Sequence, residues 1–566
     1  MHGTVSEFGN RAQGNGTSRA AILEMSGLRL EACSVDVWTP IVHGINLTVH
    51  KGEVLGLIGE SGAGKSTIGL AALGYARDGC RISGGSILFD GTDLNGCTDK
   101  KLRNLRGKRI AYVAQSAAAA FNPAHRIIDQ CIEVPVHMAG RRRSQAIKDI
   151  KRIFGLLQLP DPESIGDRYP HQLSGGQLQR AMVAMAMAGH PDLIVFDEPT
   201  TALDVTTQIE VMASIRHAVE HAGTAAIYVS HDLAVVAQMA HRVMVLRHGA
   251  VVEEGEVGAI LHDPRREYTK ALVSARQTSH AHRPVDTDDE VIISVEDVRA
   301  SYGKSPVLNG INFEIPRQRT VAVVGESGSG KSTVARVITG LLPPDRGVVR
   351  YGKGILPSFY GKRTKDELRQ IQMVYQMPDT ALNPKHSVRD VIGRPLEFYL
   401  GLDKVQREKR IRELLSLIEL DPDEFIDRTA TELSGGQKQR ICIARALAAE
   451  PSVIICDEVT SALDQLVGEE IIRLLNDLQS RLGLSYLFIS HDLATVRAVA
   501  DYVLVMRSGD IVDFGSTDAI FNPPYHEYTE LLLSSVPEMR QDWLYKLLQD
   551  RDNKKATDLR KRIAAT

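Results

Sequence analysis

Short runs of four or five apolar residues recur along the chain, and longer stretches with helical spacing separate them. In the first half these runs occupy residues 54–58, 193–196, 225–229 and 243–246. Continuous apolar runs of this length are typical of strands that are buried on both faces of a parallel sheet. The alternation predicts an α/β fold with a largely parallel central sheet, and the helix-rich segment at about 121–188 predicts a helical insert.

The same order of features occurs twice, which indicates a duplicated domain. Corresponding residues have a nearly constant offset: 266 for Lys65 and Lys331, 261 for Gln115 and Gln376, and 260 for Ser174 and Ser434, Asp197 and Asp457, and His231 and His491. We therefore predict two tandem domains, at 21–275 and 291–536. A disordered tail is expected at 1–20, a polar linker at 276–290 and a charged tail at 537–566.

Within the charged tail, residues 543–547 have the spacing of a short amphipathic helix. Such a helix either docks on a partner or packs on the surface of its own chain, and its sequence favours packing. The pattern alone leaves both interpretations open.

The composition excludes several classes of protein. The chain has 43% hydrophobic and 24% charged residues, which are globular values, and its net charge of −3 gives no electrostatic basis for binding nucleic acid. No segment reaches the ~18 consecutive apolar residues of a membrane span, and no secretion signal is evident, so a cytoplasmic location is expected. None of the six cysteines forms a C-x-x-C pair, so we expect reduced thiols.

A glycine-rich loop between the run at 54–58 and a helix-compatible run at 68–73 is typical of a phosphate-binding P-loop. In such a loop, backbone N–H groups and a helix N-terminus face phosphate oxygens. We expect Lys65 to reach the β- and γ-phosphates and Ser66 to ligate Mg²⁺. The predicted nucleotide-binding residues of this loop are Gly59, Ser61, Gly62, Gly64, Lys65, Ser66 and Thr67.

A second loop of this type follows the apolar run at 321–324, so a chance match would have to occur twice in the same context. Its predicted nucleotide-binding residues are Gly325, Ser327, Gly328, Gly330, Lys331, Ser332 and Thr333.

Each domain also has an apolar run that ends in two carboxylates, Asp197 and Glu198 in the first copy and Asp457 and Glu458 in the second. Beside a P-loop, the aspartate is expected to hold Mg²⁺ through water and the glutamate to polarise the attacking water. An Asp-Glu pair at a strand end is common by itself. Its recurrence at a similar distance after a P-loop in both copies favours the catalytic interpretation.

A Leu-Ser-Gly-Gly-Gln sequence precedes a helical run in each copy, at 173–177 and at 433–437. Its serine is a good helix N-cap, and the glycines after it let an anion approach the helix N-terminus. Together with the P-loops, these sequences predict a nucleotide held from two sides. The candidate residues are Ser174, Gly176, Gln177, Ser434, Gly436 and Gln437.

These motifs, over about residues 21–536, resemble the ATP-binding subunits of ABC transporters with both nucleotide-binding domains fused in one chain. The resemblance implies two tandem P-loop NTPase domains of the ABC type. Each would have a mostly parallel core sheet, an antiparallel subdomain and a helical subdomain. It also implies Q-loop glutamines Gln115 and Gln376, which would contact nucleotide and Mg²⁺, and switch histidines His231 and His491, which would hold the γ-phosphate.

The family further implies a head-to-tail arrangement with two ATP molecules between the domains. One site would combine the first P-loop with Ser434 and Gly436, and the other the second P-loop with Ser174 and Gly176. Because both copies have the glutamate, we predict two hydrolytically competent sites.

Two departures from the family pattern concern single residues. Tyr302 is in place to stack on adenine in the second copy, whereas residues 30–33 of the first copy offer no ring, and Trp38 is a possible substitute. Val459 replaces the proline that stands at Pro199 in the first copy, and we expect little effect.

Segments near 115–123, 169–174, 263–269, 376–384 and 522–529 are similar to those of oligopeptide, dipeptide, nickel and glutathione importers. The resemblance implies two transmembrane permease subunits, an extracytoplasmic substrate-binding protein and a peripheral position on the cytoplasmic face of the inner membrane. An exporter ATPase, a ribosome-binding translation factor and a DNA-repair ATPase are the alternatives. The short linker disfavours the second, and the lack of room for zinc modules or long coiled coils disfavours the third.

Overall fold

The computed structural model describes residues 20–34, 37–201, 203–274, 289–551 and 553. Nearly all of the predicted disordered tail and of the linker, the end of the charged tail and Ala202 therefore lie outside the described residues. Each predicted domain contains one six-stranded sheet and one four-stranded sheet. Within the described part of the chain, no helix is long and apolar enough to cross a membrane.

The central sheet of the first half has the order β10-β9-β3-β8-β7-β6. Its strands are β3 (Val54–Gly59), β6 (Ile110–Val113), β7 (Leu193–Asp197), β8 (Ala225–Val229), β9 (Arg242–Arg247) and β10 (Ala250–Glu256). All neighbouring strands are parallel except β9 and β10. Strands β3, β7 and β8 are buried along their whole length, which explains their continuous apolar sequence.

An antiparallel sheet with the order β2-β1-β4-β5 lies beside it. Its strands are β1 (Ala21–Ser34), β2 (Val37–His50), β4 (Cys80–Phe89) and β5 (Thr92–Asp93). Side chains of this sheet share one apolar cluster with α1 (Lys65–Ala71), which follows the P-loop. This packing fixes the direction in which the P-loop helix points.

The predicted helical insert lies between β6 and β7. Its main helices are α3 (Ala117–Ala120), α4 (Ile127–Cys131), α5 (Arg143–Leu156) and α6 (Gly175–Met187). Helices α7 (Val205–Ala222), α8 (Leu233–Met239), α9 (Val257–His262) and α10 (Glu267–Ser274) complete the first half. The fold class predicted from the sequence is confirmed.

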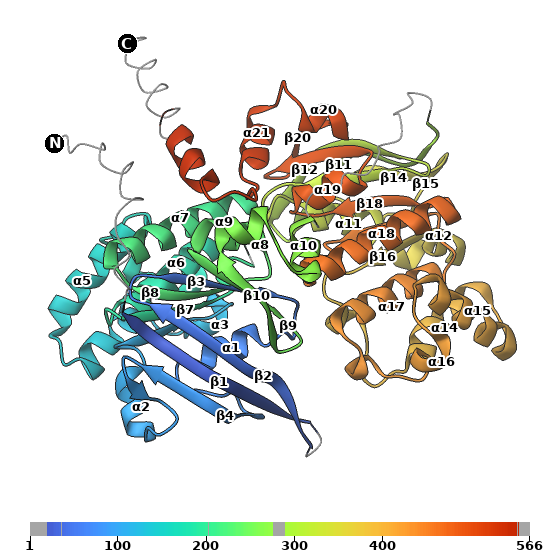
Figure 1. Ribbon diagram of the computed structural model, residues 1–566. Helices are drawn as coiled ribbons and strands as arrows, with labels where there is room; N and C mark the ends of the chain where they lie inside the picture. Colours follow the sequence, from blue (N-terminus) through green and yellow to red (C-terminus); the bar gives the residue numbers. More distant parts are fainter. Residues whose placement is uncertain (1–19, 35–36, 202, 275–288, 552, 554–566) are drawn as a thin grey trace, which may run out of the picture.

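The second half repeats this arrangement with sheets β16-β17-β18-β13-β19-β20 and β12-β11-β14-β15. The strands of these sheets include β14 (Arg346–Tyr351), β15 (Gly354–Ile355), β19 (Tyr502–Arg507) and β20 (Asp510–Ser516). The elements that bear on the site are β11 (Val291–Tyr302), β12 (Ser305–Pro316), β13 (Thr320–Val324), α11 (Lys331–Ile338), β16 (Ile371–Val374), α17 (Gly435–Leu447), β17 (Val453–Asp457), α18 (Gln465–Leu482), β18 (Ser485–Ile489), α19 (Leu493–Val499) and α21 (Glu527–Ser534). In Figure 1 the helical parts of the two halves lie toward opposite sides of the molecule.

The two halves meet through equivalent elements. Helix α10 of the first half contacts α18 of the second, and α21 of the second contacts α7 of the first. Gln465 on α18 donates a hydrogen bond from Nε2 to the carbonyl oxygen of Leu272 on α10, at 3.3 Å. These reciprocal contacts are consistent with a pseudo-twofold relation between the duplicated domains.

Beyond α21, the chain returns to the first half (Figure 1). Residues 543–551 form a helix, as the amphipathic pattern predicted, and we call residues 537–551 the C-terminal strap. Trp543 and Leu544 are 4% and 1% exposed and belong to the same apolar cluster as Met239 and Val257 of the first half. The helix therefore packs on its own chain, against the domain that lies farther away in sequence.

The side chain of Gln238 on α8 holds this strap. Its Nε2 donates to the carbonyl oxygens of Glu538 and Arg540, at 3.0 and 2.7 Å, and its Oε1 accepts from the backbone N–H of Leu544 at 3.1 Å. Gln238 is only 3% exposed, so these bonds satisfy a buried amide.

Candidate functional site

The first P-loop connects the buried end of β3 to the start of α1. Gly62 and Gly64 have φ angles of 83° and 90°, which favour glycine over any residue with a side chain. The Lys65 ammonium donates to the carbonyl oxygens of Gly59 and Glu60, at 2.7 and 2.9 Å. Lys65 is 6% exposed and lies inside its own loop. Phosphate oxygens bound there would compete with the two carbonyl oxygens for its hydrogen bonds.

The second P-loop repeats these contacts. Gly328 and Gly330 have φ angles of 79° and 104°, and Lys331 donates to the carbonyl oxygens of Gly325 and Glu326, at 2.9 and 2.8 Å. Both glycine-rich sequences therefore form the same loop after the same kind of strand.

The serine after each lysine bonds to the aspartate that ends another parallel strand of the same sheet, β7 in the first half and β17 in the second. Ser66 Oγ donates to Asp197 Oδ1 at 2.7 Å, and Ser332 Oγ donates to Asp457 Oδ1 at 3.1 Å. A hydroxyl and a carboxylate beside a phosphate-binding loop are oxygen ligands of the kind that Mg²⁺ takes from proteins, with water and phosphate completing its coordination. The residues present therefore fit this ion.

The glutamate after each aspartate adopts a left-handed backbone conformation, with φ of 48° at Glu198 and 51° at Glu458. Such values are uncommon for residues with a side chain and cluster at functional sites. The turn places each carboxylate beside the predicted glutamine and histidine of its own half.

Three groups converge on Glu198. Its Oε2 accepts from Gln115 Nε2 at 3.2 Å and from Thr201 Oγ1 at 3.0 Å, and it lies 3.3 Å from His231 Nδ1. In the second half, Gln376 Nε2 donates to Glu458 Oε2 at 2.6 Å, and His491 Nδ1 lies 3.4 Å from Glu458 Oε1. The predicted P-loop, aspartate, glutamate, glutamine and histidine of each half are thus brought together.

The charges in each cluster shift the pKa values of its members. Burial alone would raise the pKa of Glu198, but the hydrogen bond and charge of His231, together with the charge of Lys65, leave it below its usual range. Burial works against the charged form of His231, yet Glu198 raises its pKa. Glu458 raises the pKa of His491 through their hydrogen bond, which outweighs burial. Both clusters favour an ionised glutamate beside a protonated histidine.

The Leu-Ser-Gly-Gly-Gln sequences begin α6 and α17. Ser174 Oγ accepts from the backbone N–H of Gln177 at 3.3 Å, and the side chain of Gln177 accepts from the backbone N–H of Ser174 at 3.2 Å. Ser434 and Gln437 form the same reciprocal cap. Both glutamines therefore cap a helix in this structure.

The glycine at position 176 also allows two helices to pack closely. A Cβ atom there would lie 2.2 Å from Thr207 Cγ2 on α7, and a Cβ at Gly436 would lie 2.5 Å from Val467 Cγ1 on α18. Sequence reasoning linked these glycines to anion approach, and the structure adds a packing requirement.

The segments after the two glutamates cross from each half toward the other. A hydrogen bond of 2.9 Å joins Thr206 Oγ1 to Glu326 Oε1, in the P-loop of the opposite half. Asp464 is among the carboxylates that favour the charged form of Lys65, although burial dominates and lowers the pKa of that lysine. Asp204 acts in the same way on Lys331. Each P-loop is therefore adjacent to the other half.

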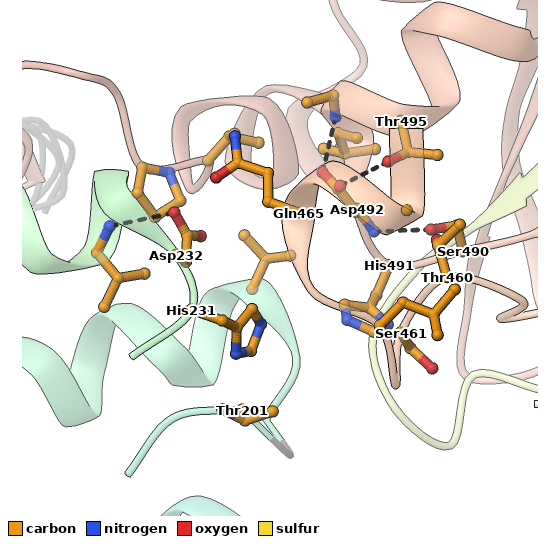
Figure 2. Close-up of a pocket in the computed structure, with 18 of the residues that line it drawn as sticks. Thr201, His231, Asp232, Thr460, Ser461, Gln465, Ser490, His491, Asp492 and Thr495 are labelled. Atoms are coloured by element: carbon orange, nitrogen blue, oxygen red, sulfur yellow. Dashed lines mark hydrogen bonds between the residues drawn. The ribbon is translucent and has the colours of Figure 1, made fainter. Parts of the chain in front are cut away.

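A cavity of about 440 Å³ lies between the halves and is lined by both histidines. Figure 2 shows His231 and Thr201 from the first half on one side, and His491, Thr460 and Ser461 from the second half on the other. The halves thus enclose a space where residues of both clusters face one another.

The two halves differ at the position expected to stack on adenine. Tyr302 ends β11, and its hydroxyl accepts a hydrogen bond from Arg336 at 2.8 Å. Counting from the bulge that both hairpins share, Ala32 takes the place of Tyr302. Trp38 pairs with Cys33, the residue after Ala32. Its side chain therefore lies on the face of the hairpin opposite to that of Ala32. The first half therefore has a small side chain where the second has a ring.

Two contacts in the first cluster were not anticipated from the sequence. Thr201 bonds to Glu198, and Tyr112 Oη donates to Asp197 Oδ2 at 2.7 Å. Tyr112 is in an apolar strand and reads as a core residue. Tyr112 is brought near Asp197 by the parallel pairing of β6 with β7, which no local sequence pattern predicts.

Comparisons with known proteins agree with this geometry. A family model described as "ABC transporter" matches residues 42–201 and 308–461. A model described as "Oligopeptide/dipeptide transporter, C-terminal region" matches residues 512–561, which include the whole C-terminal strap.

Curated relatives align with most of the chain. The glutathione import ATP-binding protein GsiA of Pectobacterium atrosepticum is 35% identical over 545 residues, covering 88% of this chain and 87% of its own length. GsiA of Salmonella paratyphi A is 35% identical and covers 91% and 89%. A solved structure of cbiO1 from Clostridium perfringens, described as part of the ABC transporter complex cbiONQ, is 29% identical; it matches with a TM-score of 0.37 and covers 41% of this chain and 91% of its own.

Proposed function

Because the chain belongs to the ABC transporter family and is an ATP-binding, ATP-hydrolysing subunit, we propose that it powers the import of peptides or a related small solute such as glutathione. The observation that carries this proposal is the repeated cluster of lysine, serine, aspartate, glutamate, glutamine and histidine, one in each half, with each P-loop adjacent to the opposite half. The match of residues 512–561 to the oligopeptide/dipeptide transporter model supports the solute class.

Each nucleotide would be bound mainly by the backbone N–H groups of one P-loop and by its lysine. In the first half, Lys65 would release the two carbonyl oxygens that it now bonds and contact the phosphates. Opposite it, Ser434 and Gly436 at the N-terminus of α17 would complete the site when the halves close. Ser174 and Gly176 would do the same for Lys331.

Mg²⁺ would be held by Ser66 and Asp197 in the first site and by Ser332 and Asp457 in the second, with Gln115 and Gln376 at its edge. When bound, the ion would neutralise charge that develops on the phosphate oxygens.

The chain's own groups would position the attacking water. The carboxylate of Glu198, whose lowered pKa keeps it ionised, would accept a hydrogen bond from that water and orient it. His231, protonated beside it, would donate to the γ-phosphate. Glu458 and His491 would have these roles in the second site, so both sites would hydrolyse ATP.

Import also requires partners. We propose that two membrane-spanning permease subunits dock near the two Q-loops, and that an extracytoplasmic binding protein delivers the solute. The chain would then be peripheral on the cytoplasmic face of the membrane, attached through these partners, and closure of its halves would drive alternating access.

Purification of the chain from its native membranes tests this assembly. Recovery of two membrane subunits would support the proposal, and recovery of ribosomal proteins without them would contradict it. Reconstitution of the complex in liposomes would then be expected to give ATP hydrolysis that a peptide or glutathione stimulates through the binding protein. Stimulation by neither solute would refute the proposed solute class.

A further inference from the structure

The two aspartates expected to hold Mg²⁺ have different hydrogen-bonding partners. Asp197 accepts from Ser66 at Oδ1 and from the Tyr112 hydroxyl at Oδ2, each at 2.7 Å, so both carboxylate oxygens have a donor. Asp457 accepts from Ser332 at Oδ1, at the longer distance of 3.1 Å.

The difference arises from one substitution between equivalent positions. Tyr112 lies opposite Val195 in the pairing of β6 with β7, and Met373 lies opposite Ile455 in the pairing of β16 with β17. Methionine has no hydrogen-bond donor, so the second half lacks this contact to its aspartate.

The surroundings of Asp197 favour a defined carboxylate orientation. Asp197 is 3% exposed, and the Tyr112 ring packs partly buried against the core beside α1. A hydroxyl held by a packed ring orients the carboxylate without cancelling its charge. Arg77 Nη2 lies 3.7 Å from the same Oδ2, but its side chain is 56% exposed, so water screens its charge.

We propose that Tyr112 is a positioning residue for Mg²⁺ in the first site, and that the two nucleotide sites of this chain therefore differ in metal affinity. The inference rests on the proposed role of Ser66 and Asp197 as Mg²⁺ ligands. With its aspartate fixed at both oxygens, the first site binds the metal more tightly than the second. Loss of partners that orient metal ligands typically lowers metal affinity by about 10- to 100-fold.

Titration of Mn²⁺ into the full chain with a non-hydrolysable ATP analogue tests this, with free Mn²⁺ measured by electron paramagnetic resonance. The wild-type chain is expected to bind two Mn²⁺ per chain with two distinct affinities. Tyr112→Phe removes the hydroxyl but keeps the ring, and is expected to weaken the tighter site about 10-fold while the weaker site is unchanged. Affinity for the analogue without metal stays the same.

Tyr351→Phe is the matched control, because it removes a strand hydroxyl that bonds Gln370 and Ser452 instead of a metal-site residue. It leaves the Mn²⁺ titration unchanged. Met373→Tyr places a hydroxyl at the equivalent position of the second half and is expected to bring the two affinities closer together.

Two Mn²⁺ per chain with the same two affinities in wild type and Tyr112→Phe would overturn the inference while leaving the proposed function intact. A chain that binds no Mn²⁺ with the analogue at either site would overturn both.

Discussion

Each histidine–glutamate pair is the part of its site whose charge responds to pH near neutrality. In the second half, the hydrogen bond that His491 donates to Glu458 raises the pKa of His491 above its ordinary 6.5. The folded chain therefore binds this proton more tightly than the unfolded chain. The stabilisation from the pair is complete below pH 6.5 and is lost as the pH rises through the raised pKa.

His491→Gln is expected to lower the free energy of unfolding of the nucleotide-free chain at pH 6, by up to about 1 kcal/mol, because a partly exposed ion pair contributes that much. The difference from wild type would shrink at alkaline pH. Chemical denaturation at several pH values measures it, and His125→Gln, at an exposed position, is the control. A difference that grows with pH would contradict the assigned sign.

Substitution of the two glutamates tests whether both sites turn over. We expect Glu198→Gln and Glu458→Gln each to reduce steady-state ATP hydrolysis strongly and to a similar extent, because each replaces the carboxylate that orients water in one site. The double variant loses hydrolysis while still binding nucleotide. Intact turnover in Glu198→Gln beside abolished turnover in Glu458→Gln would show that only the second site is active.

Among single residues, the sequence predicts those that belong to short motifs. The residues of each P-loop, strand-end carboxylate pair, Q-loop and switch histidine lie together because each follows a strand of one parallel sheet, whose ends share an edge. Thr201 and Tyr112 bond to the same carboxylates, yet they escape prediction because their contacts depend on strand pairing and turn geometry.

At the scale of the elements, the contact between α6 and α7 depends on the absence of a side chain at Gly176. Gly176 lets α6 approach Thr207, whose hydroxyl also donates to Asp204 Oδ2 at 3.0 Å in the cap of α7. Rotation of Thr207 away from a new Cβ would break that bond. A side chain at position 176 would therefore also disturb the start of α7, where Thr206 bonds to Glu326 of the opposite P-loop.

Gly176→Ala is expected to destabilise the chain by about 1–3 kcal/mol, the usual range for overpacking. Gly155→Ala, on α5, is the matched control, since a Cβ there meets nothing within 4 Å and alanine has the higher helix propensity. Denaturant unfolding compares the two variants. Equal free energies of unfolding for Gly176→Ala and Gly155→Ala would show that α6 and α7 can move apart without loss of stability.

The largely parallel sheet, the helical insert and the duplicated fold follow from apolar runs and constant offsets, whereas the order of the strands in each sheet comes only from the structure. Helix packing does not follow in the same way, because it depends on which side chains meet between elements far apart in sequence. Gly176 illustrates the limit: its sequence context predicts an anion-binding turn, and only the packed helices show that its missing Cβ makes room for Thr207.

In the whole molecule, the C-terminal strap connects the end of the second half to α8 of the first, the helix that follows His231. In α19 of the second half, the position equivalent to Gln238 is Ala498, which has no side-chain amide to hold such a segment. The strap therefore makes the duplicated domains unequal. The amphipathic pattern at 543–547 predicted its helix, but the surface that the helix covers depends on how the halves assemble.

Trp543→Ala is expected to destabilise the first half by about 3–5 kcal/mol, because it empties a buried aromatic position. Tyr545→Ala on the same helix, where the side chain is 55% exposed, is the control and is expected to have little effect. Limited proteolysis within 537–551 and thermal unfolding measure the release of the strap. Equal resistance of both variants to proteolysis would show that Trp543 does not anchor it.

The position of the strap also bears on how the chain folds during synthesis. The first half leaves the ribosome hundreds of residues before Trp543 and Leu544, which complete its apolar cluster. Until translation reaches the strap, the part of this cluster that Trp543 and Leu544 pack against lacks their cover. The apolar cluster of the first domain is therefore complete only when the strap has been made, after the whole of the second domain.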